Sequence, residues 1–229
     1  MLLRIRSITY LAQRINGYEL ADPEERELPP FAAGAHVSVR AGDGPVRDFS
    51  LWNDPAERGR YCIAVLREPE GQGSREWHER VRVGDIVEAS APRNNFPLCV
   101  EAEHHLLIAG GIGITPIMAM IADLRRARAD FRLDYCTRSP EDTAFLDDLS
   151  ILAAQGRVQF HHDGGDPAKG LDLEARLRGY EPGTHLYYCG PAGMMRAAEA
   201  ASRHWPPETV HCQYFAGAKA VPPMIGPAL

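Results

Sequence analysis

A short stretch near residue 50, "VRDFSLWNDP" at residues 46–55, carries three side chains that could bind one ligand together. Arg47 supplies a fixed cation, Phe49 a flat ring and Ser50 a hydroxyl, and a turn-forming Asn-Asp-Pro follows at once. An edge strand with a surface arginine would also explain this stretch if it is taken alone. A planar, phosphorylated cofactor needs all three groups, because arginine pairs with phosphate and an aromatic ring packs on a planar one.

A second stretch, "EGQGSREWH" at residues 70–78, could bind an anion. Its glycines let the backbone approach a ligand closely, and Ser74 behind Gly73 is a natural N-cap for a helix predicted over 74–81. The free N–H groups at the start of such a helix favour an anion. A Gly-x-Gly-Ser turn commonly only caps a helix, so the turn alone is weak support. A cation in one segment and an anion-binding helix start in another together predict a site for a flavin phosphate.

Two further stretches place glycines where a strand gives way to a helix. In "LLIAGGIGITPIMAM", Gly110, Gly111 and Gly113 depart from the G-x-G-x-x-G spacing but offer a similar tight turn and helix N-terminus for a pyrophosphate. We therefore favour phosphate binding here over a merely tight crossover. In "LYYCGPAGMM", Cys189 and its neighbours stand at the ligand edge of the sheet. Taken alone, that stretch is better explained by a small buried cysteine before a helix start.

The predicted elements that position these stretches show two different sequence patterns. Residues 1–99 contain short apolar or alternating runs between turn residues, which predict a small antiparallel barrel with one interposed helix. From residue 105, strands alternate with helices, which predicts a parallel sheet covered on both faces, with ligands at the carboxyl ends of its strands. We place the boundary in the Pro/Asn-rich joint 90–98, which gives domains 1–99 and 100–229. The predicted strands are 2–12, 35–40, 47–52, 60–67, 85–92, 105–110, 131–136, 157–161, 185–189 and 209–215, and the predicted helices of the second domain are 115–129, 144–155, 171–177 and 192–204.

Charge and hydropathy restrict the partners. The net charge of −6 on 229 residues argues against nucleic acid as the main partner, because phosphate backbones require a basic face. No apolar run approaches the roughly 18–20 residues that span a bilayer. Arg4 and Arg6 come too early for a secretory signal. We therefore expect no membrane partner and a cytoplasmic protein.

Cysteine and histidine usage argues against a metal. The five cysteines lie 23 or more residues apart, unlike the close-set thiolates of zinc or iron–sulfur sites. Their odd number and wide spacing fit reduced thiols rather than a disulfide framework. The pairs His104-His105 and His161-His162 lack supporting carboxylates or cysteines, so we expect solvated strand ends. The chain has no G-x-S-x-G elbow, which argues against a hydrolase. No metal and no iron–sulfur cluster is expected on this chain.

The order of the motifs is similar to that of a known family. Between about residues 5 and 215, the chain carries the successive motifs R-x-aromatic-S, G-x-G-S, GGIGITP, CGP and "VHCQYF". With these motifs, the chain resembles the ferredoxin reductase-like flavoproteins. Within these, "LPPFAAGAHVSV", "SAPRNNFPL" and "YCGPAGMM" are most similar to the family of phthalate dioxygenase reductase and vanillate demethylase reductase. The resemblance implies an antiparallel Greek-key β-barrel that binds flavin, followed by an α/β parallel-sheet domain that binds a nicotinamide cofactor.

The resemblance also implies roles for individual residues. Arg47 would hold the FMN phosphate, Phe49 would pack against the isoalloxazine, and the Ser50 hydroxyl would bond near N5, the atom that accepts hydride. Cys189 would border the nicotinamide, and Phe215 would shield the other flavin face until the nicotinamide displaces it. Ser50, Cys189 and Phe215 are thus the expected catalytic residues. The other residues expected to bind cofactor are Asp48, Leu51, Ala64, Val65, Gly71, Gln72, Gly73 and Ser74 for the flavin, and Gly110, Gly111, Gly113, Thr115, Pro116, Thr137, Arg138, Gly190, Pro191 and Met194 for the nicotinamide cofactor.

Two departures from the family pattern affect this interpretation. Phe49 stands where the family generally has tyrosine, so one hydroxyl contact worth about 0.5–1.5 kcal/mol is missing while the ring surface remains. Family members usually continue into a plant-type ferredoxin domain with a C-x4-C-x2-C run, whereas this chain ends at Leu229. The chain is therefore either a two-domain reductase that serves a separate iron–sulfur protein or a piece of a longer protein.

The resulting hypothesis is a flavin-dependent NAD(P)H oxidoreductase. NADH would pass hydride to N5 of FMN, and electrons would leave one at a time to a separate ferredoxin or to the oxygenase component. FAD and NADPH stay open as alternatives: an acidic residue in "YCTRSPED" would favour NAD, while Arg138 could meet a 2′-phosphate. A free-flavin reductase or diaphorase would instead hold its flavin exchangeably. A non-catalytic flavin-binding subunit would not let the nicotinamide bleach the flavin.

Overall fold

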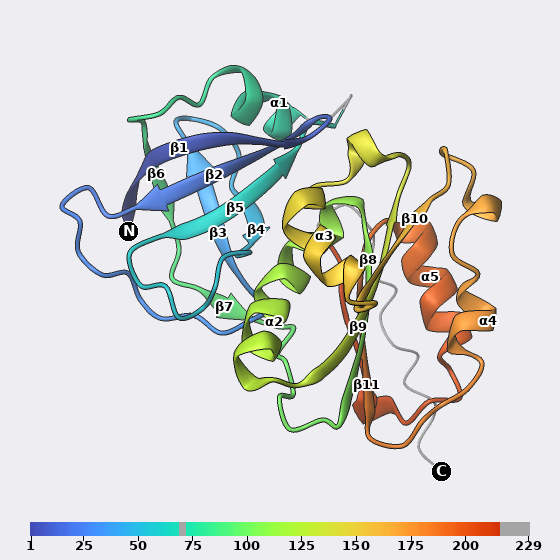
Figure 1. The fold of residues 1–229 in the computed structure, drawn as a ribbon. Helices are drawn as coiled ribbons and strands as arrows, with labels where there is room; N and C mark the ends of the chain where they lie inside the picture. Colours follow the sequence, from blue (N-terminus) through green and yellow to red (C-terminus); the bar gives the residue numbers. More distant parts are fainter. Residues whose placement is uncertain (69–71, 216–229) are drawn as a thin grey trace, which may run out of the picture.

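Two β-sheets lie side by side in the computed structural model, which describes residues 1–68 and 72–215. Figure 1 shows the sheet built from the N-terminal half beside a second sheet that has helices on both faces. Among the predicted site residues, Gly71 lies outside the described residues. The strands of the first sheet are β1 (Leu2–Ala12), β2 (Ile15–Ala21), β3 (Ala35–Ala41), β4 (Arg47–Ser50), β5 (Tyr61–Leu66), β6 (Ile86–Ala89) and β7 (Arg93–Asn94).

The first sheet is antiparallel and rolls into a barrel. Its strand order is β4-β3-β6-β1-β2-β5, with β7 paired to β3. The two edges meet where the Trp52 N–H, just after β4, donates to the Cys62 carbonyl oxygen of β5 at 3.0 Å. Alternate side chains of β1 and β6 fill the interior, because successive residues of a strand face opposite sides. Backbone pairing and an apolar interior therefore both hold the barrel.

One helix, α1 (Gln72–Glu79), packs on the barrel. Its Trp77 is buried with its ring edge-on to Tyr18 at 4.9 Å, and the Tyr18 hydroxyl donates to the Trp77 carbonyl oxygen at 2.9 Å. The helix begins two residues before the predicted 74–81, so Ser74 lies in the first turn and is not the N-cap. The Ser74 hydroxyl instead accepts a hydrogen bond from the Glu68 N–H at 3.1 Å, which ties the helix start to the end of β5.

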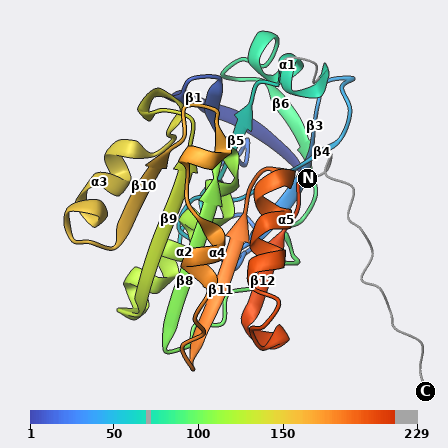
Figure 2. The same cartoon turned by 90° about the vertical axis from the view of Figure 1, so that its right-hand side faces the viewer.

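The second sheet is parallel, with strand order β10-β9-β8-β11-β12. Helices α2 and α3 cover one face, and α4 and α5 cover the other (Figures 1 and 2). An antiparallel barrel followed by such a parallel sheet confirms the predicted fold class. The elements are β8 (His104–Gly110), α2 (Ile114–Ala127), β9 (Asp130–Thr137), α3 (Leu146–Ala154), β10 (Val158–His162), α4 (Leu173–Leu177), β11 (Thr184–Cys189), α5 (Ala192–Ala201) and β12 (Val210–Gln213), with 3₁₀ turns η1 (Gly111–Gly113), η2 (Pro140–Asp142), η3 (Pro167–Lys169) and η4 (Pro207–Thr209).

Strands β2 and β7 are missing from the sequence prediction. In β2, the dipeptide Asn16-Gly17 has the composition of a hairpin turn, yet both residues pair within the strand. The turn between β1 and β2 falls instead at Arg14, whose φ is +64°. β7 lies inside the predicted joint 90–98, so the first sheet ends at Asn94 and the second begins at His104. The domain division at residue 99 stays a prediction that falls between these two strands.

The expectation of solvated histidine pairs is wrong for two of the four rings. His105 is 2% exposed, and its ring nitrogens lie 3.0 and 2.9 Å from two backbone carbonyl oxygens. His161 is partly buried, with Nε2 2.7 Å from a carboxylate oxygen of Asp134. Each lies within a parallel strand that continues through the pair, so the alternation of the strand turns one ring of each pair inward.

The cysteines do not pair in this fold, and all five are free thiols. In residues 1–68 and 72–215, no three His, Cys, Asp or Glu side chains are grouped to hold a metal ion. No helix in the same two ranges has the length and apolar character needed to cross a membrane.

Candidate functional site

A cleft of about 2070 Å³ runs between the barrel and the carboxyl ends of the parallel strands. Its volume exceeds the roughly 300–1,000 Å³ of a pocket for one small molecule, so it can hold two ligands side by side. The cleft brings together predicted residues from segments that are far apart in the chain. The barrel contributes Arg47, Asp48, Phe49, Ser50, Ala64, Val65, Gly73 and Ser74, and the second domain contributes Gly110, Gly111, Thr115, Thr137, Arg138, Gly190, Pro191, Met194 and Phe215.

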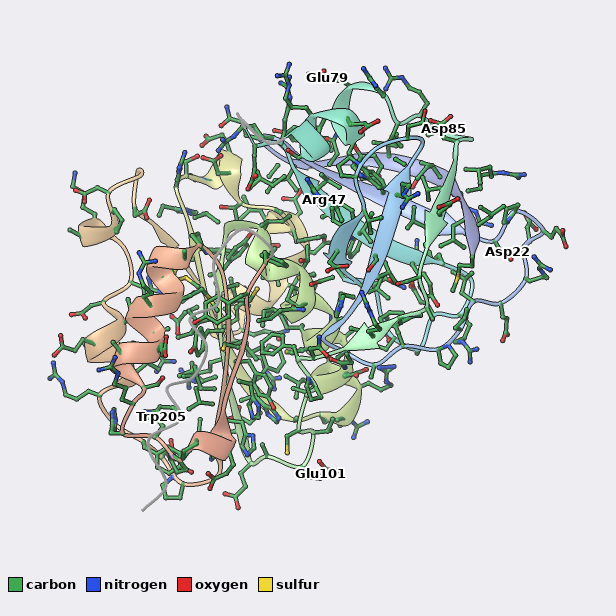
Figure 3. The ribbon with its side chains drawn as sticks, turned by 180° about the vertical axis from the view of Figure 1, so that it is seen from behind. Asp22, Arg47, Glu79, Asp85, Glu101 and Trp205 are labelled. Carbon is green, nitrogen blue, oxygen red and sulfur yellow. The ribbon has the colours of Figure 1, made fainter. Side chains whose placement is uncertain are left out.

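The Arg47 guanidinium offers an anion site on the barrel side of the cleft. Arg47 is exposed at the start of β4, where the barrel faces the second domain (Figure 3). Its Nη1 donates to the Val46 carbonyl oxygen at 3.0 Å, while the neighbouring Asp48 pairs with Arg93 at 3.5 Å. A Cβ on Gly73 would fall 2.9 Å from Arg47 Nε. Glycine therefore leaves the guanidinium open to a ligand, and the first-turn N–H groups of α1 add to the positive field.

Phe49 and Ser50 are held in place at the cleft wall. The Phe49 ring packs edge-on against Trp77 at 5.2 Å. Ser50 is 3% exposed, and its Oγ donates to Gln213 Oε1 at 3.2 Å. Because Gln213 ends β12, this hydrogen bond joins the barrel to the second domain. Sequence reasoning missed Gln213, although it stands two residues before Phe215 in the quoted "VHCQYF".

Glycines bring the ends of β8 and β11 into close contact. A Cβ on Gly190 would fall 2.4 Å from Met194 Cε and 3.0 Å from Gly110 Cα, and one on Gly110 would fall 2.6 Å from Pro191 Cδ. Gly111 differs from both, because it has φ +51° and open space on its Cβ side. The turn therefore presents bare backbone to the cleft at Gly111, in a conformation that favours glycine.

Among the predicted residues whose side chains, or Cα atoms in glycines, the structure describes, four do not line the cleft: Leu51, Gly113, Pro116 and Cys189. The Leu51 and Cys189 side chains are fully buried, and burial raises the pKa of the Cys189 thiol well above its ordinary value. Gly113 packs against the backbone of the neighbouring strand, since a Cβ there would fall 2.2 Å from the Cys189 carbonyl oxygen. Pro116 is buried as well, so all four residues pack behind the cleft wall, and their expected roles at a ligand stay predictions. Gln72 is described only by its backbone, as the first residue of α1.

The end of β9 presents both signs of charge to the cleft. Arg138 is exposed in the lining, and Asp142 and Asp163 line the same region. Arg14, at the tip of the β1–β2 hairpin, lies 3.6 Å from Asp142 across the domain boundary. A guanidinium and two carboxylates are therefore placed to meet either a phosphate or a pair of hydroxyls.

Comparison with known proteins identifies the second domain directly. Residues 107–200 match the family model described as the oxidoreductase NAD-binding domain. The tert-butanol monooxygenase / tert-amyl alcohol desaturase reductase subunit of Aquincola tertiaricarbonis is 54% identical over 96% of this chain and 66% of its own length. The vanillate O-demethylase oxidoreductase of Pseudomonas sp. strain HR199 is 42% identical over 95% of this chain and 69% of its own length.

A solved structure agrees with these relatives. Phthalate dioxygenase reductase, described as a modular structure for electron transfer from pyridine nucleotides to [2Fe-2S], matches with a TM-score of 0.89 and 43% identity, covering 93% of this chain and 67% of its own. The chain thus spans about two thirds of the length of the relatives it matches. It belongs to the ferredoxin reductase-like oxidoreductases, in the family of phthalate dioxygenase reductase and vanillate O-demethylase reductase.

Proposed function

We propose that this chain is an NAD(P)H-dependent flavin oxidoreductase that serves as the reductase component of an oxygenase system. FMN is the proposed flavin and NADH the proposed reductant. Electrons pass on to an iron–sulfur acceptor, either a separate ferredoxin or the oxygenase component. The observation that carries this proposal is the shared cleft, in which a cation-and-glycine cradle on the barrel faces the glycine-lined strand ends of an NAD-binding domain.

The barrel side of the cleft fits a flavin nucleotide. Because Gly73 has no side chain, a phosphate can approach the Arg47 guanidinium together with the N–H groups at the start of α1. Phe49 presents a ring that Trp77 fixes from behind, and Val65 adds apolar surface to the same wall. A bound flavin supplies a hydride acceptor that can release electrons singly. The choice of FMN over FAD rests on the family resemblance.

The chain's own residues contribute position rather than acid–base chemistry. Gln213 Oε1 accepts the one O–H of Ser50, so the Ser50 oxygen is held ready to accept a hydrogen bond from a ring N–H. Gly111 and the N-terminus of α2 present N–H groups to a pyrophosphate. Phe215 lines the cleft just beyond β12 and is placed to cover a planar ring. Holding two reactants in one cleft makes the transfer between them effectively unimolecular.

An anaerobic spectroscopic titration tests the proposal. The purified protein is loaded with FMN or with FAD, passed through a desalting column and titrated with NADH or NADPH, with a plant-type [2Fe-2S] ferredoxin added as acceptor. We expect FMN to be retained, NADH to bleach its visible bands and the ferredoxin to be reduced. If the flavin is lost on the desalting column but the protein still reduces added flavin with a nicotinamide cofactor, the protein is a free-flavin reductase. Retained flavin that neither nicotinamide bleaches would contradict the proposal.

A further inference from the structure

Four rings lie together on one face of the parallel sheet, toward the amino ends of its strands. We call His105, His185, Tyr187 and His211 the ring row. The register pairs His105 with His185 and Tyr187 with His211. His211 stacks on His185 and on Tyr187, with ring centroids 5.2 and 4.5 Å apart and interplanar angles of 16° and 15°. Gln213 follows His211 by two residues on β12, so its side chain leaves the same face of the sheet.

Within the ring row, His185 and His211 are joined by a hydrogen bond. His185 Nδ1 lies 3.0 Å from His211 Nε2. One of these nitrogens must donate and the other accept, so the contact requires at least one ring to be neutral. One added proton leaves this bond intact, whereas a second sets two N–H groups against each other. Burial lowers the pKa of both histidines, and the charge of a neighbouring histidine lowers each further, so the neutral pair is the favoured form.

The groups that surround the pair offer little to offset a second positive charge. On β8, His105 is buried and contributes a repulsive charge when protonated. On η4, the Glu208 carboxylate opposes that effect more weakly. On β11, burial raises the pKa of Tyr187 to about 12, so the phenol is neutral, and its oxygen accepts from the Cys99 N–H at 2.8 Å. Acid therefore weakens the ring row at the His185–His211 contact.

The strand that depends on this contact is short and lies at a sheet edge. β12 has four residues and pairs only with β11 in the strand order. His211 sits near its start, and Gln213 at its end accepts the Ser50 hydrogen bond across the cleft. Cross-strand side-chain contacts stabilise such a strand in addition to its few backbone hydrogen bonds. His211 and the residue that holds the Ser50 hydroxyl therefore lie two positions apart on one short strand.

We propose that His211 is a positioning residue: hydrogen-bonded to His185, it holds β12 in register so that Gln213 fixes the Ser50 hydroxyl, and double protonation of the pair releases the strand at acid pH. This inference rests on the proposed function, because only there does the Ser50 hydroxyl face a bound flavin. His211 itself touches no reacting atom in this scheme.

Hydrogen exchange of the segment 207–215 tests the release without any activity measurement. Exchange is followed by mass spectrometry on the protein as purified, between pH 7.5 and 5.0, and is corrected for the intrinsic pH dependence of amide exchange. We expect protection to be constant above the ordinary histidine pKa of 6.5 and to fall below it, by up to about tenfold per pH unit once the pair titrates. Protection that stays constant down to pH 5.0 would overturn the proposal.

Two variants separate titration from simple loss of packing. His211→Gln keeps a group that can bond to His185 but does not itself titrate, so its protection should fall less steeply with acid than that of the wild type. His104→Asn is the matched control, because His104 titrates at the same end of the sheet but alternates to the opposite face of β8. Its exchange profile should match that of the wild type. A His211→Gln profile that falls with acid as steeply as that of the wild type would assign the transition to another group and refute the role of His211.

The link to Ser50 is tested by the rate of flavin reduction in the FMN-loaded protein. In stopped-flow mixing with NADH, the rate constant should fall as the pH is lowered, in parallel with the exchange protection, and His211→Gln should make this acid dependence less steep. His211→Ala should lower the rate constant about tenfold at pH 7.5, as expected for one lost hydrogen bond of about 1.4 kcal/mol. If NADH fails to reduce flavin at every pH, the proposed function fails while the exchange result still decides the strand release. If reduction occurs with no acid limb, the link from His211 to Ser50 is wrong.

Discussion

Replacing Gly113 with alanine tests whether this glycine of the GGIG turn serves the fold or the ligand. A Cβ on Gly113 would fall 2.2 Å from the Cys189 carbonyl oxygen and 2.5 Å from its carbonyl carbon. The two segments must separate by about 0.8 Å to lengthen the closer contact even to 3.0 Å. No side-chain rotation can relieve the overlap, because both partners are backbone. Overpacking a core costs about 1–3 kcal/mol, and we expect the upper end of that range here.

Urea unfolding followed by tryptophan fluorescence measures the effect. With a slope of about 1–3 kcal/mol per molar urea, the midpoint should fall by about 1 M or more. Gly111→Ala is the matched control in the same turn: its Cβ meets nothing within 4 Å, so it carries only the strain of φ +51°, about 1–2 kcal/mol. Gly111 lines the cleft, so that variant should also raise the KM for NADH. A Gly113→Ala protein with the wild-type midpoint and only a raised KM would refute this reasoning.

Other predictions concern the Arg47 guanidinium and the buried carboxylate of Asp134. Arg47→Ala should weaken FMN binding about tenfold or more, because it removes a charged hydrogen bond worth about 1.5–3 kcal/mol. Arg40 is not among the residues that line the cleft, so the control variant Arg40→Ala should leave the FMN dissociation constant unchanged. Asp134→Asn should lower the free energy of unfolding by about 2 kcal/mol in urea titrations, because the carboxylate accepts hydrogen bonds from His161 and Arg176 at 2.7 Å. Burial alone would raise the pKa of Asp134, but the hydrogen bonds to its carboxylate have the larger effect and lower that pKa from its ordinary value of 3.8. Wild-type stability should therefore fall as pH drops below 3.8, and an equal slope in Asp134→Asn would contradict this assignment.

Much of the fold and part of the cleft follow from local sequence rules. Alternating apolar positions predict β1 and β6, and strand–helix alternation predicts the parallel sheet. The rule that ligands bind at the carboxyl ends of parallel strands predicts that Gly110 and Gly190 share one edge, where the structure places them in contact. Arg47 and Gly73 are 26 positions apart, and only the joint order of motifs suggests that they meet.

The remaining features depend on tertiary packing that no local pattern encodes. The hydrogen bond from Ser50 to Gln213 spans 163 positions and exists only because the barrel docks against the edge strand of the second sheet. The Cys189 side chain faces the core while its neighbour Gly190 lines the cleft, because β11 ends at Cys189 and Gly190 begins the turn beyond it. Asn16-Gly17 looks like a turn, but pairing with β1 and β5 overrides that preference.

A crystal structure of the FMN-loaded protein soaked with NAD⁺ under anaerobic conditions would test the central claim most directly. We predict the flavin phosphate within hydrogen-bond distance of the Arg47 guanidinium and next to Gly73, with the flavin ring against Phe49. We also predict the dinucleotide pyrophosphate at Gly111 and the start of α2, with both cofactors in the one cleft. Flavin density elsewhere on the barrel, or a dinucleotide bound away from the ends of β8 and β11, would contradict the claim.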